Sequence, residues 1–76
     1  MKALLERIAR GLVDEPGSVR VEEWTEDGMV HFDVEVAEPD RGRVIGRQGR
    51  TADAIRTVIE AAGRRRGIDC DVEILD

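Results

Sequence analysis

Cysteine, histidine and aromatic residues are almost missing from this sequence. Its 76 residues include one cysteine, Cys70, one histidine, His31, and only two aromatic side chains, Trp24 and Phe32. One cysteine cannot form an internal disulfide, and with one histidine it supplies neither a structural zinc site nor a Ser/His/Asp or Cys/His catalytic set. Two aromatics are too few for a platform that stacks several bases. These absences predict a fold held by packing alone, with no metal, no cofactor and no enzymatic activity.

Long hydrophobic runs are missing as well. No apolar stretch approaches the ~20 residues of a membrane-spanning helix, and charges at Lys2, Glu6 and Arg7 interrupt the first residues too early for a secretory signal. We therefore expect a cytoplasmic protein with no membrane partner. A chain of 76 residues has room for one domain, 1–76, with a small core. Such a core leaves little room for a deep pocket, so we expect no small-molecule substrate.

The charges are segregated along the chain. The formal net charge is −5, which by itself argues against a polyanionic partner. Residues 1–40 contain four basic and eleven acidic residues, whereas residues 41–66 contain eight arginines and only two acids. The planar guanidinium of arginine suits phosphate. The basic segment is therefore either a phosphate-binding surface or a solvated face whose arginines pair with acids elsewhere in the fold.

Hydrophobic spacing predicts three helices. An apolar stripe at helical spacing predicts the first over residues 2–13. Asp40, after Pro39, is placed to cap a short second helix over residues 41–45, and a third runs over about residues 50–62 with Gly63 as its C-terminal stop. The first stripe consists of Leu4, Leu5, Ile8, Ala9 and Leu12, and the inward residues of the third helix are Ala52, Ile55, Val58, Ile59 and Ala62.

Alternation of apolar and polar residues predicts three strands. It is regular over residues 30–36 and 68–74. An earlier alternation starts at Val19 and Val21, but Trp24 falls on the opposite parity, so either a bulge intervenes or the indole lies on the outer face. The run 26–28, Glu-Asp-Gly, indicates a hairpin turn. The resulting order, αββααβ, predicts a two-layer α+β domain in which helices cover one face of a three-stranded sheet.

Two glycines bracket two long polar residues between the second and third predicted helices. In the run 46–49, Gly-Arg-Gln-Gly, the glycines allow a sharp turn and a close approach of a ligand to the backbone. The free amides at the start of the third helix lie beside this loop, and Arg47 and Arg50 add full positive charges. The loop is therefore predicted to bind an anion. Val44 stands where a P-loop or a GxGxxG motif requires glycine, and a helix-turn-helix would have a first helix of only about six residues.

The run 42–52, Gly-Arg-Val-Ile-Gly-Arg-Gln-Gly-Arg-Thr-Ala, resembles the signature of KH domains. The element order resembles the type II variant of that family, and the resemblance extends over essentially the whole chain. It implies that the loop holds the backbone of single-stranded RNA while bases lie on an apolar groove, about four nucleotides per domain.

Site residues can be carried over from the family by position. The resemblance implies an RNA clamp formed by Gly46, Arg47, Gln48 and Gly49, with Arg43 and Arg50 beside it. Two positions depart from the family pattern, because Ala52 is small and Asp53 stands where relatives often have a base. Asp53 is expected to weaken RNA binding by repulsion. Candidates for the groove, or for the core behind it, are Val44, Ile45, Ala54, Ile55 and Val58.

Several alternatives stay open at this point. The main interpretation is a single-stranded RNA-binding protein of low sequence specificity, an RNA chaperone or post-transcriptional regulator. The first alternative is an adaptor that forms a homodimer or a heterodimer with another KH protein, and the second is a protein that binds single-stranded DNA. The run 64–66, Arg-Arg-Arg, either extends the RNA path or caps its helix. Trp24 either covers the sheet or contributes to a protein interface.

Overall fold

The order of the elements is the one that the sequence predicts. The computed structural model describes residues 1–75. Its helices and strands alternate as αββααβ, which confirms the type II order, and three-residue 3₁₀ turns precede β1, α2 and α3. The elements are α1 (Lys2–Leu12), β1 (Arg20–Glu26), β2 (Met29–Glu35), α2 (Arg41–Ile45), α3 (Arg50–Arg65) and β3 (Asp69–Ile74).

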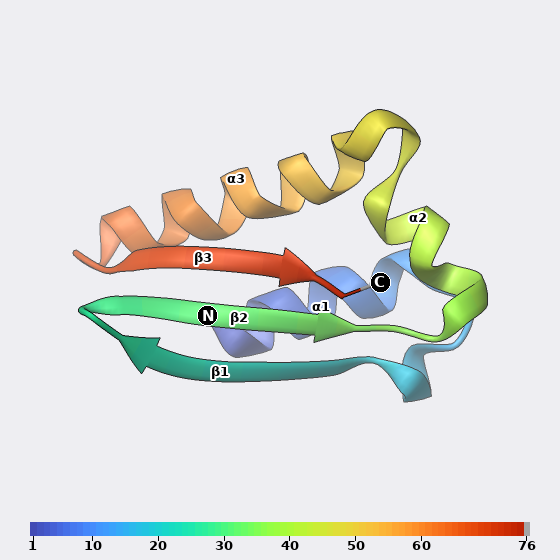
Figure 1. Ribbon diagram of the computed structural model, residues 1–76, viewed down its shortest axis with the longest axis horizontal. Helices are drawn as coiled ribbons and strands as arrows, with labels where there is room; N and C mark the ends of the chain where they lie inside the picture. The colour runs from blue at the N-terminus through green and yellow to red at the C-terminus, as the bar shows by residue number, and fades with distance from the viewer. Residues whose placement is uncertain (76) are drawn as a thin grey trace.

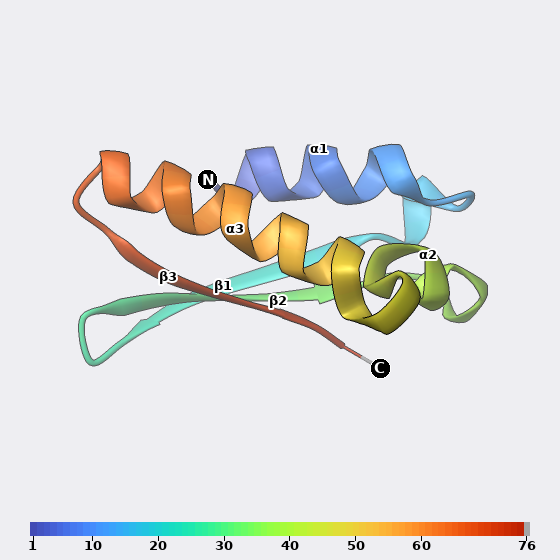
Figure 2. The ribbon, with the colours of Figure 1, turned by 90° about the horizontal axis from the view of Figure 1, so that it is seen from above.

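The sheet and the helices form two layers. The strands lie in the order β1-β2-β3, with β1 antiparallel and β3 parallel to the central strand β2. Helices α1 and α3 both lie on one face of the sheet, and the opposite face is open, as the view from above shows (Figure 2). The short helix α2 and the loop after it lie at one end of the molecule (Figure 1). Among residues 1–75, no helix is long and apolar enough to cross a membrane.

The β1–β2 hairpin explains the parity of Trp24. Asp27 and Gly28 both have positive φ, 52° and 78°, as a two-residue hairpin turn requires. The register from Arg20↔Glu35 to Glu26↔Met29 is unbroken. There is no bulge in this hairpin, and the indole lies on the open face of the sheet, 41% exposed.

The core lies between the sheet and the helical layer. Alternate residues of β2 and β3 point into it, as their period-two pattern predicts, and Leu5 and Ala9 supply the contribution of α1. Leu4 and Leu12 of the predicted apolar stripe are 38% and 37% exposed instead, because the arc of α1 that contacts the sheet is narrower than the stripe. The largest buried side chains include Phe32, Leu5, Ile59, Val19, Val34, Val44 and Val72.

Helix α3 differs from the prediction at its C-terminal end. It continues through Gly63 to Arg65, and Gly67, with φ 71°, makes the turn that follows. Gly63 is buried where the helix approaches β3, and a Cβ there would lie 2.6 Å from the carbonyl oxygen of Ile68 and 2.7 Å from Sγ of Cys70. The prediction of Gly63 as the stop was wrong because this glycine serves close packing. Val58 was expected inward and is 47% exposed.

Candidate nucleic-acid interface

The loop between α2 and α3 owes its shape to left-handed backbone conformations. Gly46 ends α2 with φ 76°, and Gln48 and Gly49 follow with φ 56° and 75°. A Cβ on Gly46 would overlap the side chain of Thr51, so this position requires glycine. A Cβ on Gly49 would meet no other atom within 4 Å, so glycine is favoured there only by the left-handed backbone conformation.

The backbone of this loop is only partly hydrogen-bonded. The amide of Gly49 donates to the carbonyl of Gly46 at 3.1 Å, and the amide of Arg50 donates to the carbonyl of Arg47. Arg47 and Gln48 are the first two residues of a 3₁₀ turn, so their amides have no partner within it, and among residues 1–75 no bond joins them to a loop or side-chain acceptor. Both side chains are exposed. The loop therefore presents two free backbone donors at its tip, which is the feature that anion binding requires.

The arginines around the loop differ in their partners. In the described part of the chain, Arg47 and Arg50 form no ion pair, and Arg50 only donates to Oε1 of Gln48 at 3.4 Å. Arg43 behaves differently, because its Nη2 lies 2.9 Å from Oδ2 of Asp14 and its Nε 3.7 Å from Oδ1 of Asp40. The charge of Arg43 is thus balanced by two carboxylates, while the charges of Arg47 and Arg50 remain available.

Asp53, which was expected to repel RNA, has a partner of its own. Its Oδ1 lies 2.9 Å from Nη1 of Arg56, one turn further along α3. The Nε of Arg56 in turn donates to the carbonyl oxygen of Val72 in β3 at 2.9 Å. This pairing places a positive charge against the carboxylate and so reduces the repulsion expected from Asp53.

The five apolar candidates for the base-binding groove differ in how deeply they are buried. Val44 is fully buried and Ile55 is 4% exposed, so both belong to the core and have no surface to offer a base. Ile45 is half-buried beside the loop, and Ala54 and Val58 are exposed, one helical turn apart on α3. Only these last three residues present apolar surface near the loop.

Sequence reasoning missed the role of Asp40. It was expected to cap α2, but its side chain makes no capping hydrogen bond. The carboxylate is 1% exposed and accepts hydrogen bonds from the backbone amides of Asp14 and Glu15 at 3.1 and 3.0 Å. It thereby joins the segment after α1 to the beginning of α2. An acid after proline looks the same in the sequence whether it caps its own helix or binds a distant loop.

The three arginines after residue 63 lie far from the loop. Arg64 and Arg65 end α3 and Arg66 follows them, at the opposite end of a helix of 16 residues that is about 24 Å long. The last carbonyls are satisfied by the backbone, since Gly63 accepts from the amides of Arg66 and Ile68 at 2.9 and 2.8 Å. The side chains of Arg64, Arg65 and Arg66 are exposed. They are separate from the positive charges at the loop.

Cys70 is part of the core. Burial, with a smaller contribution from the neighbouring Asp69, raises the pKa of its thiol above the ordinary value. Such a thiol remains protonated and is a poor nucleophile at neutral pH. Within the described residues, no group of three or more His, Cys, Asp or Glu side chains is arranged to hold a metal ion.

Comparisons with known proteins agree with this geometry. Residues 2–74 match the model of the family described as KhpA/KhpB, KH domain. An RNA-binding protein KhpA from Clostridium acetobutylicum is 49% identical over 75 residues, which cover 99% of this chain and 100% of that protein. The RNA-binding protein KhpA of Halalkalibacterium halodurans is 43% identical over the full length of both chains. That of Chlamydia pneumoniae is 37% identical over all of this chain and 97% of its own.

The match spans the whole fold and includes the loop at residues 46–49. KH domains are not an enzyme family, which confirms the expectation of a protein without catalytic activity. From its element order, its loop and these full-length relatives, the chain belongs to the KhpA/KhpB family of KH domains.

Proposed function

We propose that this protein binds single-stranded RNA through the loop at residues 46–49. The observation that carries the proposal is the exposed tip of the loop, where the amides of Arg47 and Gln48 are free and the guanidinium groups of Arg47 and Arg50 have no acidic partner among residues 1–75. Free amides and unpaired arginines bind phosphate oxygens. The full-length relatives named RNA-binding protein KhpA support the same function.

The groove for the bases is formed in this proposal by Ile45, Ala54 and Val58. These side chains are aliphatic and offer no hydrogen-bond donor or acceptor to a base edge. Contacts to phosphate carry no sequence information. The complex is therefore of low sequence specificity, which suits an RNA chaperone or a post-transcriptional regulator in the cytoplasm.

The test is a double substitution at the tip of the loop, Arg47→Asp with Gln48→Asp. It places two carboxylates where phosphates must pass, so we expect RNA binding to be abolished while the domain stays folded. The measurement is the fluorescence anisotropy of a short labelled single-stranded RNA, with circular dichroism to check the fold. Unchanged RNA affinity of this variant would contradict the proposal.

A matched control separates the loop from net charge. Ala3→Asp with Arg7→Asp changes the charge by the same amount on exposed positions of α1, away from the loop. This variant should bind RNA with nearly the affinity of the parent protein. Competition by DNA of the same sequence tests the alternative substrate, because only RNA offers 2′-hydroxyl groups. Equal competition by both nucleic acids would favour a general single-strand binder.

Pairing of two KH domains is a second candidate function, favoured by a specific observation. The helical layer exposes large aliphatic side chains, among them Leu4 and Leu12 on α1 and Val58 on α3. Exposed apolar surface of this kind is found at protein interfaces, and joining two short grooves increases affinity through avidity. We therefore expect a homodimer or a heterodimer with another KH protein. Sedimentation at micromolar concentration tests this, and a monomer that binds RNA would exclude an obligate dimer.

A further inference from the structure

The face of the sheet that points away from the helices is strongly acidic. Alternate residues of each strand lie on it, because their neighbours Val21, Phe32 and Val72 point into the core. Figure 1 looks onto this face of the sheet. By strand register it carries seven carboxylates. They are Glu22, Glu26, Asp33, Glu35, Asp69, Asp71 and Glu73. We name these residues, together with Arg20, Trp24, Met29 and His31, the open face.

The carboxylates of the open face are aligned rather than dispersed. Glu22, Asp33 and Glu73 are register partners across the three strands. Adjacent strands lie about 4.8 Å apart, and like charges directly opposite one another destabilise a sheet. Nδ1 of His31 lies 3.5 Å from Oδ2 of Asp71, and within the described residues no Lys or Arg forms an ion pair with a carboxylate of the open face. The face therefore holds uncompensated negative charge that a cationic partner would neutralise.

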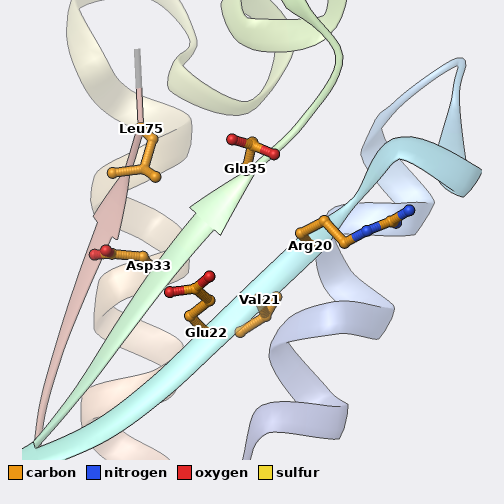
Figure 3. Close-up of a pocket in the computed structure, with 6 residues that line it drawn as sticks. All are labelled: Arg20, Val21, Glu22, Asp33, Glu35 and Leu75. Atoms are coloured by element: carbon orange, nitrogen blue, oxygen red, sulfur yellow. The ribbon is translucent and has the colours of Figure 1, made fainter.

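Arg20 does not neutralise its neighbours. Its Nη1 donates to the carbonyl oxygens of Gly17 and Val19, both at 2.8 Å. In Figure 3 its guanidinium points away from the carboxylates of Glu22 and Asp33. These two carboxylates, Glu35 and the aliphatic side chain of Leu75 line a shallow hollow on the face. The hollow combines an apolar wall with negative charge, which suits the stem and head of a long basic side chain.

An aromatic pair lies beside this row of carboxylates. The rings of Trp24 and His31 are stacked, with centroids 5.3 Å apart and an interplanar angle of 17°. Trp24 and His31 are register partners and form one row across the strands. The neighbouring rows contain Glu22 on one side and Glu26 with Asp69 on the other. A guanidinium group stacks on such a surface and gains both cation–π attraction and the attraction of the nearby carboxylates.

The spacing of the rows points to the shape of the partner. Successive rows are two residues apart along each strand, which is about 6.7 Å. Every second side chain of an extended peptide has the same spacing. The carboxylates are spread over these rows, and no three of them are arranged to hold one metal ion in the described structure. A second copy of the chain would bring the same net charge of −5 and the same acidic face, which disfavours a contact between the open faces of two copies.

We propose that the open face binds an extended, arginine-rich segment of another protein. Alternate arginines of the segment lie over the rows of carboxylates, and one of them stacks on Trp24. The loop at residues 46–49 lies at the end of the molecule next to α2 (Figure 1) and stays free for a nucleic acid. The two surfaces have opposite charge, so RNA and the basic segment bind different sides of one domain.

The test uses a short synthetic peptide of alternating arginine and serine. Trp24 is the only tryptophan of the chain, so its fluorescence reports on the open face without a label. We expect a saturable change in its emission with the arginine peptide and none with the same peptide made with citrulline, which keeps the shape and lacks the charge. No response to the arginine peptide would overturn the proposal.

Two charge-matched variants distinguish a specific face from general attraction. The face variant is Glu22→Gln with Asp33→Asn and Glu73→Gln, and the control replaces three other exposed glutamates, at positions 15, 38 and 60, by glutamine. The face variant should lose about tenfold or more in peptide affinity, and the control less than about threefold, because its carboxylates lie off the face. Equal losses would show attraction by net charge only and would overturn the proposal.

Other occupants of the face give different results. A Trp24 response to magnesium chloride alone would assign the face to a divalent cation. Self-association in sedimentation that the face variant abolishes would assign it to a second copy, and either result would overturn the proposal. The face variant should bind RNA at least as tightly as the parent protein, because it carries three fewer negative charges. Peptide binding is measured without RNA, so its failure is independent of the RNA-binding proposal.

Discussion

Asp40 is a buried side chain that supports the proposed RNA-binding loop without being part of it. Its carboxylate holds two backbone amides of the segment after α1 and lies 3.7 Å from Nε of Arg43 in α2. The short helix α2 ends directly at Gly46, the first residue of the loop. The position of the loop therefore depends on a contact that neither belongs to the family signature nor faces the nucleic acid.

We predict that Asp40→Asn lowers the free energy of unfolding by about 1–3 kcal/mol, because the asparagine side chain has one oxygen instead of two and a partly buried backbone amide loses its acceptor. Urea denaturation measures this change. Asp14→Asn is the matched control, since it removes only the exposed ion pair with Arg43, and such pairs contribute about 0–1 kcal/mol. An Asp40→Asn variant as stable as the control would show that the two hydrogen bonds do not stabilise the fold.

Arg43 and Asp53 show why a residue type alone does not define a binding residue. Arg43 lies next to the loop in the sequence, yet in the structure it pairs with Asp14 and Asp40. Asp53 has the wrong charge for an RNA site, yet Arg56 pairs with it. The pairing of Asp53 with Arg56 follows from their i,i+3 spacing on one helix, whereas the pairing of Arg43 with Asp14 depends on folding that brings α2 to the segment after α1.

Helix α3 is the element that joins the loop to the sheet. Its first turn follows Gly49, its buried side packs on β3, and its last turns pass so close to β3 that Gly63 has no room for a side chain. The exposed side carries Ala54 and Val58. The helix thus supplies the core, the proposed groove and the close contact with the edge strand.

We predict that Gly63→Ala destabilises the domain although alanine favours a helix. The gain in helix propensity is about 1 kcal/mol, whereas a methyl group 2.6 Å from the carbonyl of Ile68 forces a shift that typically costs about 1–3 kcal/mol. The net change should be a loss of stability in thermal and urea denaturation. Gly11→Ala in α1 is the control, because no heavy atom lies within 4 Å of its new Cβ. It should stabilise the protein by up to about 1 kcal/mol, and a stabilising Gly63→Ala would contradict the close packing of α3 on β3.

At the scale of the whole molecule, positive and negative side chains lie on different surfaces, and the net charge does not show this. The formal charge of −5 suggests repulsion of RNA, but Arg47 and Arg50 lie at the end of the molecule with the loop, and the aligned carboxylates lie on the open face of the sheet. In the two proposals, local charge, more than net charge, therefore decides where each partner binds.

We predict a shallow salt dependence of RNA binding. A domain that neutralises three or four phosphates of a single strand should give a slope of log K against log salt of about −2 to −3. Titrations of labelled RNA at several salt concentrations measure this slope. Arg47→Ala should reduce the slope by about 0.7 if this side chain contacts one phosphate. A slope near zero would show that phosphate contacts do not dominate the affinity.

Much of this structure was predictable because it depends on neighbours in the chain. Alternation over residues 30–36 predicted a strand, Asp27 and Gly28 predicted the hairpin turn, and Gly46 and Gly49 predicted the shape of the loop. Each of these features follows from local backbone preferences and periodicity. The sequence by itself therefore determined the element order and the site of the loop.

Tertiary structure decided the rest, because it depends on which distant segments meet. Periodicity placed Ile55 and Val58 together, but packing on the sheet buried the first and exposed the second. Packing also brought Gly63 into close contact with β3. Strand register aligned Glu22, Asp33 and Glu73 in one row. The distance between residues far apart in the chain is set by how the layers pack, and no local pattern contains that distance.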